Sequence, residues 1–390
     1  MSRLDERIRR VARPRAAITV PAHVVTFSNS QAWAKPGAID SLATLRGLAA
    51  AWVVIYHFQG DLYGLFPVTA LLRPLFDCGN MAVPLFFILS GYVLSYNYAG
   101  RFATIERRQY LRFVLLRLAR IYPVHLATLL GVLLMVGVSR AVNLGIDEHG
   151  YSARDFLLNL LLAHTWVPNF RLNWNYPSWS ISSEWFAYLC FPLVCVAVNR
   201  VTTRRAALAL TAACFLLMQS IAWFSPRLPF KELLAVVGTF LTDCALARLL
   251  RVWRGGEVSP RFPIWMLLAV GLVPFVLTGS GLTAVLLALF AALIYGLAVL
   301  QQSCPRIWLF APLVFSGEVS YSLYMTHTLV QKVTNELLPS ALFVSSSAII
   351  RLMCLIFYLL LISGVTLLTY FIIERPYRRY LKVRLQTNAI

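Results

Sequence analysis

The chain has 390 residues, of which 59% are hydrophobic and only 13% are charged, and its mean hydropathy is +0.70. Soluble domains usually contain about 25% charged residues, so this composition excludes an ordinary soluble protein. The formal net charge of +19 at pH 7 does not indicate nucleic-acid binding, because the basic residues cluster in short segments between long apolar runs, where they set membrane topology.

Taken in chain order, the sequence predicts a polar arm, a series of membrane-spanning helices and a basic tail. Residues 1–38 are arginine-rich, and we expect a cytoplasmic, partly disordered arm. Apolar runs close to the roughly 20 residues that cross a bilayer follow. These runs lie at about 41–58, 78–98, 113–138, 179–198, 206–224, 232–250, 262–277, 282–300, 313–331 and 346–373. The apolar patch at 156–166 is too short to span, and we expect it at the interface or re-entering the membrane. Residues 375–390 form the basic tail.

This pattern predicts an all-α integral membrane protein, a bundle of about 10 transmembrane helices. With ten spans both termini lie on one side, and 27 of the 35 lysine and arginine residues fall on that side. Because basic residues favour the cytoplasmic side, both termini are expected in the cytoplasm. Residues 39–374 then form one transmembrane domain in the cell membrane, a bacterial inner or plasma membrane, and any chemistry takes place among the helices.

The seven cysteines show no spacing that is typical of a metal site, and most of them fall inside apolar runs. We therefore expect small buried side chains, with no bound metal and no structural disulfide.

The first span carries two ionisable residues, Arg46 and His57, where hydrocarbon makes charge costly. Their separation of eleven residues places them roughly on one helix face and roughly 16 Å apart in depth. A functional pair is one interpretation. The structural alternative is an arginine that reaches the interface and a histidine that hydrogen-bonds between helices.

Further ionisable residues fall at matching depths. Arg117 and Arg120 open the third span beside the predicted cytoplasmic face, whereas Glu184 and His327 fall in the outer half with His57. A group of arginines at the cytoplasmic face suits the binding of a donor that carries phosphate. An imidazole near a carboxylate suits general-base catalysis.

Structural readings of the same residues stay open at this stage. The two arginines also fit a topology signal, and Glu184 also fits a structural partner for an arginine. His327 also fits a hydrogen bond between helices. Asp243, a lone acid in the sixth span, either pairs with Arg248 or lines the interior.

Five motifs occur in a recognisable order. They are Leu45-Arg46-Gly-Leu-Ala with His57 eleven residues after the arginine, Phe86-Phe-Ile-Leu-Ser90-Gly91-Tyr92, Arg117-x-x-Arg120-Ile-Tyr-Pro123, Trp179-Ser-Ile-Ser-x-Glu184, and Ser320-Tyr321-Ser-Leu-Tyr324-x-x-His327. This order resembles the acyltransferase 3 family of integral membrane acyltransferases, over about residues 39–380. The chain resembles the stand-alone type, without an esterase-like domain. One departure is Ala43, where many members have an acid.

The resemblance implies a membrane O-acyltransferase that uses acyl-CoA, usually acetyl-CoA, as a co-substrate and holds no tightly bound cofactor. The acceptor hydroxyl would belong to a cell-surface glycan, a lipid-linked sugar or a small hydroxylated compound. The rival hypothesis is a transporter or flippase for an acidic or lipid-linked substrate, although we see no internal repeat of the kind that many transporters have.

The resemblance also implies roles for individual residues. His57 would be the general base or a transient acyl carrier, with Glu184 orienting it. Arg46 would assist catalysis by binding donor phosphate or the developing oxyanion, and Arg117 and Arg120 would bind acyl-CoA. The expected lining on the acceptor side consists of Tyr321, Tyr324, His327, Trp179 and Ser180. Ser90 and Gly91 are expected to permit close helix packing.

Overall fold

The structure is a computed structural model that describes residues 40–142, 151–224, 230–253, 259, 261–303, 311–337 and 347–387. All of these residues belong to one compact unit, Pro36–Ile390. The predicted amino-terminal arm, residues 1–38, lies outside the described residues.

The described residues fold into helices, with no β-strand among them, as the sequence predicts. The α-helices are α2 (Asp40–Leu65), α3 (Arg73–Asp77), α4 (Ala82–Tyr98), α5 (Arg107–Ala141), α6 (Ala153–Leu160), α7 (Ser178–Asn199), α8 (Arg204–Phe224), α9 (Lys231–Trp253), α10 (Phe262–Leu272), α11 (Gly279–Ser303), α12 (Ala311–Leu337), α14 (Ala348–Thr369) and α15 (Arg375–Thr387). Short 3-10 helices are η1 (Pro67–Leu72), η2 (Cys78–Met81), η4 (His164–Trp166) and η6 (Val273–Phe275), and η8 (Tyr370–Glu374) is a π-helix.

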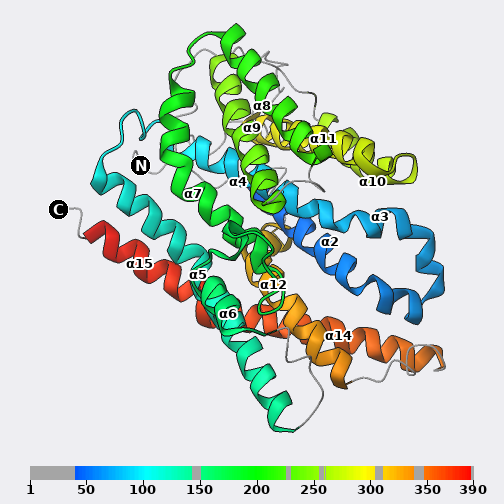
Figure 1. The fold of residues 1–390 in the computed structure, drawn as a ribbon. Coiled ribbons are helices and arrows are strands. Elements are labelled where there is room, and N and C mark those ends of the chain that lie inside the picture. The colour runs from blue at the N-terminus through cyan, green and yellow to red at the C-terminus, as the bar shows by residue number, and fades with distance from the viewer. Residues whose placement is uncertain are drawn as a thin grey trace, which may run out of the picture. The chain divides into compact units, whose positions relative to one another are not determined.

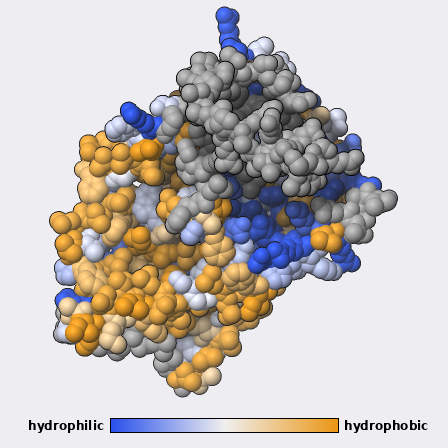
Figure 2. Space-filling model, turned by 180° about the vertical axis from the view of Figure 1, so that it is seen from behind, coloured by the Kyte–Doolittle hydropathy of each residue, from blue (hydrophilic) through white to orange (hydrophobic). Residues whose placement is uncertain are grey.

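Eight helical segments of the described residues are long and apolar enough to cross a membrane. They are Asp40–Leu65, Pro67–Tyr98, Arg107–Ala141, Ser178–Asn199, Arg204–Phe224, Lys231–Val252, Gly279–Gln301 and Ala348–Arg384. Figure 2 shows hydrophobic side chains over a broad part of one face, as a surface in contact with lipid requires. The chain is therefore a multi-pass all-α membrane protein. The other two predicted spans also form helices, Phe262–Phe275 and α12, while the count of ten crossings and the cytoplasmic termini stay predictions.

Helix α12 is less apolar than the eight segments because it lies inside the bundle. It packs along α2 and also contacts α5 and α14 (Figure 1). Six of its polar side chains are buried against these neighbours, namely Ser320, Ser322, Thr326, His327, Thr328 and Thr334. Protein partners replace water for such groups, which makes a polar helix tolerable at membrane depth.

Two glycines permit the close packing of α2 and α12. A Cβ atom added to Gly317 would overlap the backbone of Ala43, and one added to Gly47 would overlap Ser316. Small residues at such crossings let two backbones approach within a membrane. The α2–α12 pair therefore depends on the absence of side chains at these two positions.

We expect Gly317→Ala to lower the apparent melting temperature of the purified protein in detergent, because overpacking costs about 1–3 kcal/mol. Gly364→Ala is the matched control, since a Cβ on Gly364 in α14 would meet no atom within 4 Å. The control should be neutral or slightly stabilising. Equal melting temperatures for the two variants would contradict the predicted role of Gly317.

The basic tail continues the last long helix. After α14, the π-helix η8 leads directly into α15, which packs along α5 (Figure 1). A π-turn changes the phase of the residues that follow it. In η8 it leaves Tyr370 and Glu374 buried while Phe371 and Ile372 face outward. Glu374 thereby becomes an interior residue of the bundle.

The apolar patch predicted at 156–166 forms α6 and η4 between α5 and α7. Helix α6 packs against α5, and η4 packs against α7 and α9. His164 and Thr165 are buried there, whereas Leu157 and Leu161 are exposed. The segment is thus a short wedge among longer helices, and its position relative to the membrane stays a prediction.

Candidate active site

A cavity of about 110 Å³ lies between α2, α4, α5, α7 and α12. It gathers seven of the residues that the sequence analysis selected, namely Arg46, Arg117, Arg120, Ser180, Glu184, Tyr321 and Tyr324. These residues come from four helices that are distant in sequence, so the tertiary fold brings them together. The other three selected residues, His57, Trp179 and His327, lie outside the lining of this cavity.

The three arginines of the cavity have no ion-pair partner among the described residues. Among all described residues, the ion pairs are Lys231–Glu232 and Arg378–Glu374, and neither involves these three arginines. Arg46 instead donates to the Ser320 hydroxyl at 3.2 Å.

Arg117 donates to the Tyr98 hydroxyl at 3.1 Å, and its Nε is buried without a hydrogen-bond partner among the described residues. Arg120 lines the same cavity. Three guanidinium groups with no paired anion among the described residues give the cavity a positive charge that suits an anionic ligand.

Glu184 is the acid of this cavity, and its partner is a tyrosine of its own helix. The Tyr188 hydroxyl donates to the Glu184 carboxylate at 2.5 Å and lies 3.1 Å from the Ser90 hydroxyl. Ser90, expected only to permit packing, thus also lines the cavity. Within the described contacts Glu184 and His57 share no hydrogen bond, so the orienting role of Glu184 stays a prediction.

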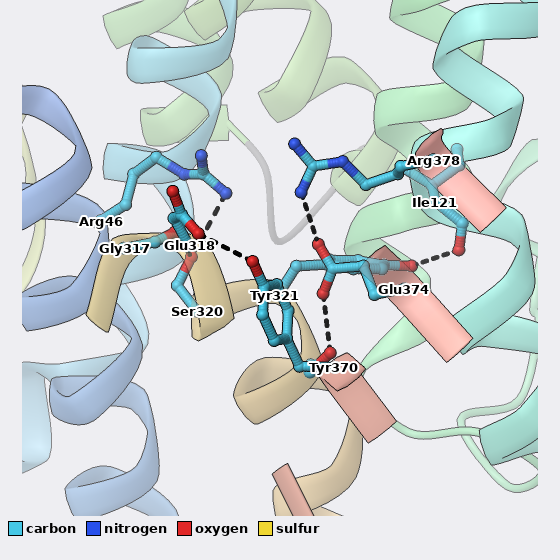
Figure 3. A network of polar contacts seen from close by, with 10 residues as sticks. Arg46, Ile121, Gly317, Glu318, Ser320, Tyr321, Tyr370, Glu374 and Arg378 are labelled. Carbon is cyan, nitrogen blue, oxygen red and sulfur yellow. Dashed lines mark hydrogen bonds and ion pairs between the residues drawn. The ribbon is translucent and has the colours of Figure 1, made fainter. Parts of the chain in front are cut away.

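A second acid near the arginines, Glu374, was not selected by the sequence analysis. It is 2% exposed, accepts a hydrogen bond from the Ser322 hydroxyl at 2.7 Å, and pairs with Arg378 at 3.1 Å. Figure 3 shows Arg46 and Arg378 pointing toward the same space, with Glu374 beside Arg378, and Glu374 is close enough to Arg46 to interact with it electrostatically. The signal in the sequence is the acid at the end of an apolar run with an arginine four residues later.

We expect Glu374→Gln to destabilise the protein by about 1–2 kcal/mol, because it breaks a buried charge-assisted contact whose arginine partner still reaches solvent. Glu318→Gln is the control. Glu318 also accepts a tyrosine hydroxyl, from Tyr370 at 2.7 Å, but Glu318 is exposed. Thermal unfolding of the purified proteins should show a larger loss of stability for Glu374→Gln than for Glu318→Gln. An equal loss in both variants would show that the burial of Glu374 does not contribute to stability.

The two imidazoles predicted at equal depth lie against each other. The ring centroids of His57 and His327 are 4.9 Å apart, and the ring of Tyr176 lies 5.4 Å from that of His57. Gln331 donates to the backbone carbonyl of His57 at 2.5 Å, which fixes this part of α2 to α12. The depth estimate from helical rise therefore brings the correct pair together.

The protonation of His327 follows from its neighbours. Its Nδ1 lies 2.6 Å from the backbone carbonyl of Tyr324, which can only accept, so Nδ1 carries the proton. Its Nε2 accepts when the ring is neutral, and it is buried without a hydrogen-bond partner among the described residues. Because His57 is half-buried while His327 is fully buried, His57 is the imidazole that a substrate can reach more easily.

Tyr324 lies between the two imidazoles and the cavity lined by Arg46, Arg117 and Arg120, which we call the arginine cavity. Its ring contacts that of His327 at a centroid distance of 5.8 Å and also lines the cavity. Its hydroxyl lies 2.8 Å from the Ser180 hydroxyl and 3.2 Å from the backbone carbonyl of Pro177. One tyrosine side chain thus stands between the place that suits an anion and the place that suits proton transfer.

A buried polar network holds the chain segment that faces the imidazoles. His125 contacts the Asn159 carbonyl through Nε2 at 2.9 Å and the Asn175 side-chain amide through Nδ1 at 3.2 Å. Ser178 donates to the Asn159 side chain at 3.0 Å. Burial lowers the pKa of His164, beside this network, to about 3, so His164 is neutral near pH 7. The network fixes the segment with Tyr176 that leads into α7, where Ser180 lies, and scattered polar residues are its only signal in the sequence.

Asp243 takes no part in the cavity. It is 1% exposed on α9, packed against Gly91, and neither carboxylate oxygen has a partner among the described residues. Arg248 donates instead to the backbone carbonyls of Val201 and Asn199. The alternative in which Asp243 pairs with Arg248 is therefore wrong, whereas the packing role expected for Gly91 fits this close approach.

Comparison with known proteins places most of the chain in a family. Residues 39–374 match a family model described as an acyltransferase domain. The acyltransferase MdmB of Streptomyces mycarofaciens is 29% identical to this chain over 345 residues, which cover 78% of this chain and 82% of MdmB. No solved structure matches the chain. The matched region contains all of the residues that line the cavity, both imidazoles and Glu374.

Proposed function

Because the chain belongs to the acyltransferase 3 family, it is a membrane acyltransferase, and we propose that it moves an acetyl group from acetyl-CoA to a hydroxyl of its acceptor. The acceptor classes we propose are a cell-surface glycan, a lipid-linked sugar and a small hydroxylated compound. One observation supports this reaction most. Three arginines that form no ion pair with any described residue share a cavity whose wall, Tyr324, contacts one of two adjacent imidazoles.

In this proposal, the cavity binds the donor through the donor's phosphate groups. Guanidinium groups bind phosphate through two parallel hydrogen bonds and stay charged in a dry site. Arg46, Arg117 and Arg120 hold the diphosphate of acetyl-CoA in the cavity. The pantetheine arm then passes Tyr324 and brings the thioester to His57. With the topology predicted above, the donor comes from the cytoplasm.

Direct transfer needs one base. His57 takes the proton of the acceptor hydroxyl while the hydroxyl oxygen attacks the thioester carbonyl. The carbon–sulfur bond breaks, the new ester bond forms, and the departing thiolate receives the proton from His57. The products are the acetylated acceptor and free CoA.

Two-step transfer is the alternative for the same residue. The His57 nitrogen attacks the thioester carbonyl, the carbon–sulfur bond breaks, and the ring N–H gives its proton to the departing thiolate, so that CoA leaves as the thiol. The acceptor hydroxyl then attacks the acetyl-imidazole, and its proton returns to the imidazole as the new ester forms. The adjacent His327, held by the carbonyl of Tyr324, positions His57 in either route.

The test uses purified protein in lipid nanodiscs with radiolabelled acetyl-CoA and a crude cell-envelope glycan fraction, followed by a panel of small hydroxylated compounds. We expect CoA release together with transfer of the label to an acceptor. Folded protein that neither binds nor cleaves acetyl-CoA or longer acyl-CoA donors would contradict the proposal and favour transport of an acidic or lipid-linked substrate.

A further inference from the structure

A second, larger cavity of about 440 Å³ lies beyond the arginine cavity, where α4 ends and α5 begins. Its lining includes Tyr98, Arg101, Phe102, Gln109, Arg112 and Phe113. The rings of Phe102 and Phe113 are only 1% exposed and pack against each other. The groups that a ligand can reach are therefore two guanidinium groups, one amide and the half-buried ring of Tyr98.

The two cavities are neighbours along the same helices. On α5, Arg117 and Arg120 line the first cavity, whereas Arg112 and Gln109 line the second. Arg117 and Gln109 are about 12 Å apart at the rise of an α-helix. The guanidinium of Arg117 stands at the boundary, because it lies 5.3 Å from the ring centroid of Tyr98 and 5.7 Å from that of Phe113. A long ligand in the first cavity would reach the second by passing Arg117.

The chemistry of the second cavity suits a nucleotide. Neither Arg101 nor Arg112 forms an ion pair within the part of the chain that the structure describes. Arg101 lies over the ring of Tyr98 at 5.4 Å, which leaves its charge available to an anion at the opening of the cavity. The Gln109 amide donates to Glu106 at 2.9 Å, so its carbonyl oxygen remains as an acceptor for an amino group. Aromatic faces and guanidinium planes are the surfaces on which nucleobases stack.

We propose that this cavity binds the adenosine end of acyl-CoA, with Arg101 and Arg112 holding the phosphate on its ribose and with Gln109 and Tyr98 beside the adenine. The inference rests on the proposed function and extends it, because it assigns the donor's adenosine end a place that the arginine cavity does not provide. The phosphate of an anionic lipid shares part of this chemistry. The Gln109 carbonyl, which can accept from the adenine amino group, and the position of this cavity next to the arginine cavity favour the nucleotide.

The experiment compares two donors in nanodiscs of zwitterionic lipid, acetyl-CoA and acetyl-dephospho-CoA, which lacks the ribose phosphate. Wild type should use the second donor with kcat/KM lower by about 10- to 100-fold, the loss expected for one charge-assisted hydrogen bond. The Arg101→Gln, Arg112→Gln double variant should use acetyl-CoA as poorly as wild type uses acetyl-dephospho-CoA, and it should no longer discriminate between the donors. Arg107→Gln, which removes an exposed charge next to the cavity, is the matched control and should keep the discrimination.

Each outcome separates the inference from the proposed function. Equal use of both donors by wild type, or unchanged discrimination in the double variant, overturns the adenosine site while acyl transfer stands. Absence of turnover with any acyl-CoA overturns the proposed function itself. Repeating the assay in nanodiscs with anionic lipid distinguishes the sources of the phosphate. An effect of the double variant that appears only there, without any change in donor discrimination, assigns the two arginines to lipid and contradicts the nucleotide site.

Discussion

Replacing His57 with alanine is expected to abolish acetyl transfer while acetyl-CoA binding persists. Positioned general bases contribute about 10²- to 10⁴-fold to a rate, so transfer should fall by at least the lower value. His57 does not line the cavity that we assign to the donor phosphates, so the Kd for acetyl-CoA should stay close to that of wild type. The measurement pairs label transfer with equilibrium binding of the same labelled donor.

A comparison variant tests whether the effect belongs to His57 itself. His327→Gln should retain more transfer than His57→Ala, because His327 is fully buried and acts through its neighbour. Label that stays on wild-type protein without acceptor, and is absent from His57→Ala, would identify the acyl carrier. Label that never stays on protein would identify the direct route. Transfer at the wild-type rate by folded His57→Ala would remove His57 from the mechanism.

Neutralising the cavity arginines is expected to weaken donor binding. Hydrogen bonds to charged groups contribute about 1.5–3 kcal/mol each, so Arg117→Gln and Arg120→Gln should each raise KM for acetyl-CoA by about 10- to 100-fold. The kcat should change much less, because neither residue is assigned to the reacting thioester. The KM of wild type should also rise with salt more steeply than that of the variants.

Arg200→Gln is the control for this pair. Arg200 is an exposed arginine at the end of α7, outside the cavity, and its loss should leave KM unchanged. A fall in kcat at unchanged KM in the cavity variants would assign the arginines to the chemical step instead. Unchanged KM and kcat would contradict an anionic donor in this cavity.

Helix geometry explains how much of the site could be predicted. The rise of an α-helix is fixed, so counting residues from the membrane faces placed His57 and His327 at one depth, and the rings are in contact. Counting does not fix the direction in which a side chain points around its helix. Glu184 shares that half of the membrane, yet its carboxylate bonds to Tyr188 one turn further along its own helix.

Other parts of the site left little trace in the sequence. Glu374 reads as the last residue of a span, and only the π-turn of η8 directs it to the interior beside Ser322. The network around His125 consists of neutral polar residues, which no pattern of spacing distinguishes from a loop. Helix α12 is also hard to recognise in the sequence as a membrane span. Several of its polar residues are buried against α2, so they lower its hydropathy without marking a face that contacts lipid.

The most direct measurement is a structure of His57→Ala in nanodiscs with acetyl-CoA bound, determined by electron cryo-microscopy with an antibody fragment as a marker. We expect the diphosphate against Arg117 and Arg120, and the thioester past Tyr324 beside the position of residue 57. Density for acetyl-CoA at another place on the protein, with this cavity empty, would contradict the claim that the arginine cavity delivers the donor to His57.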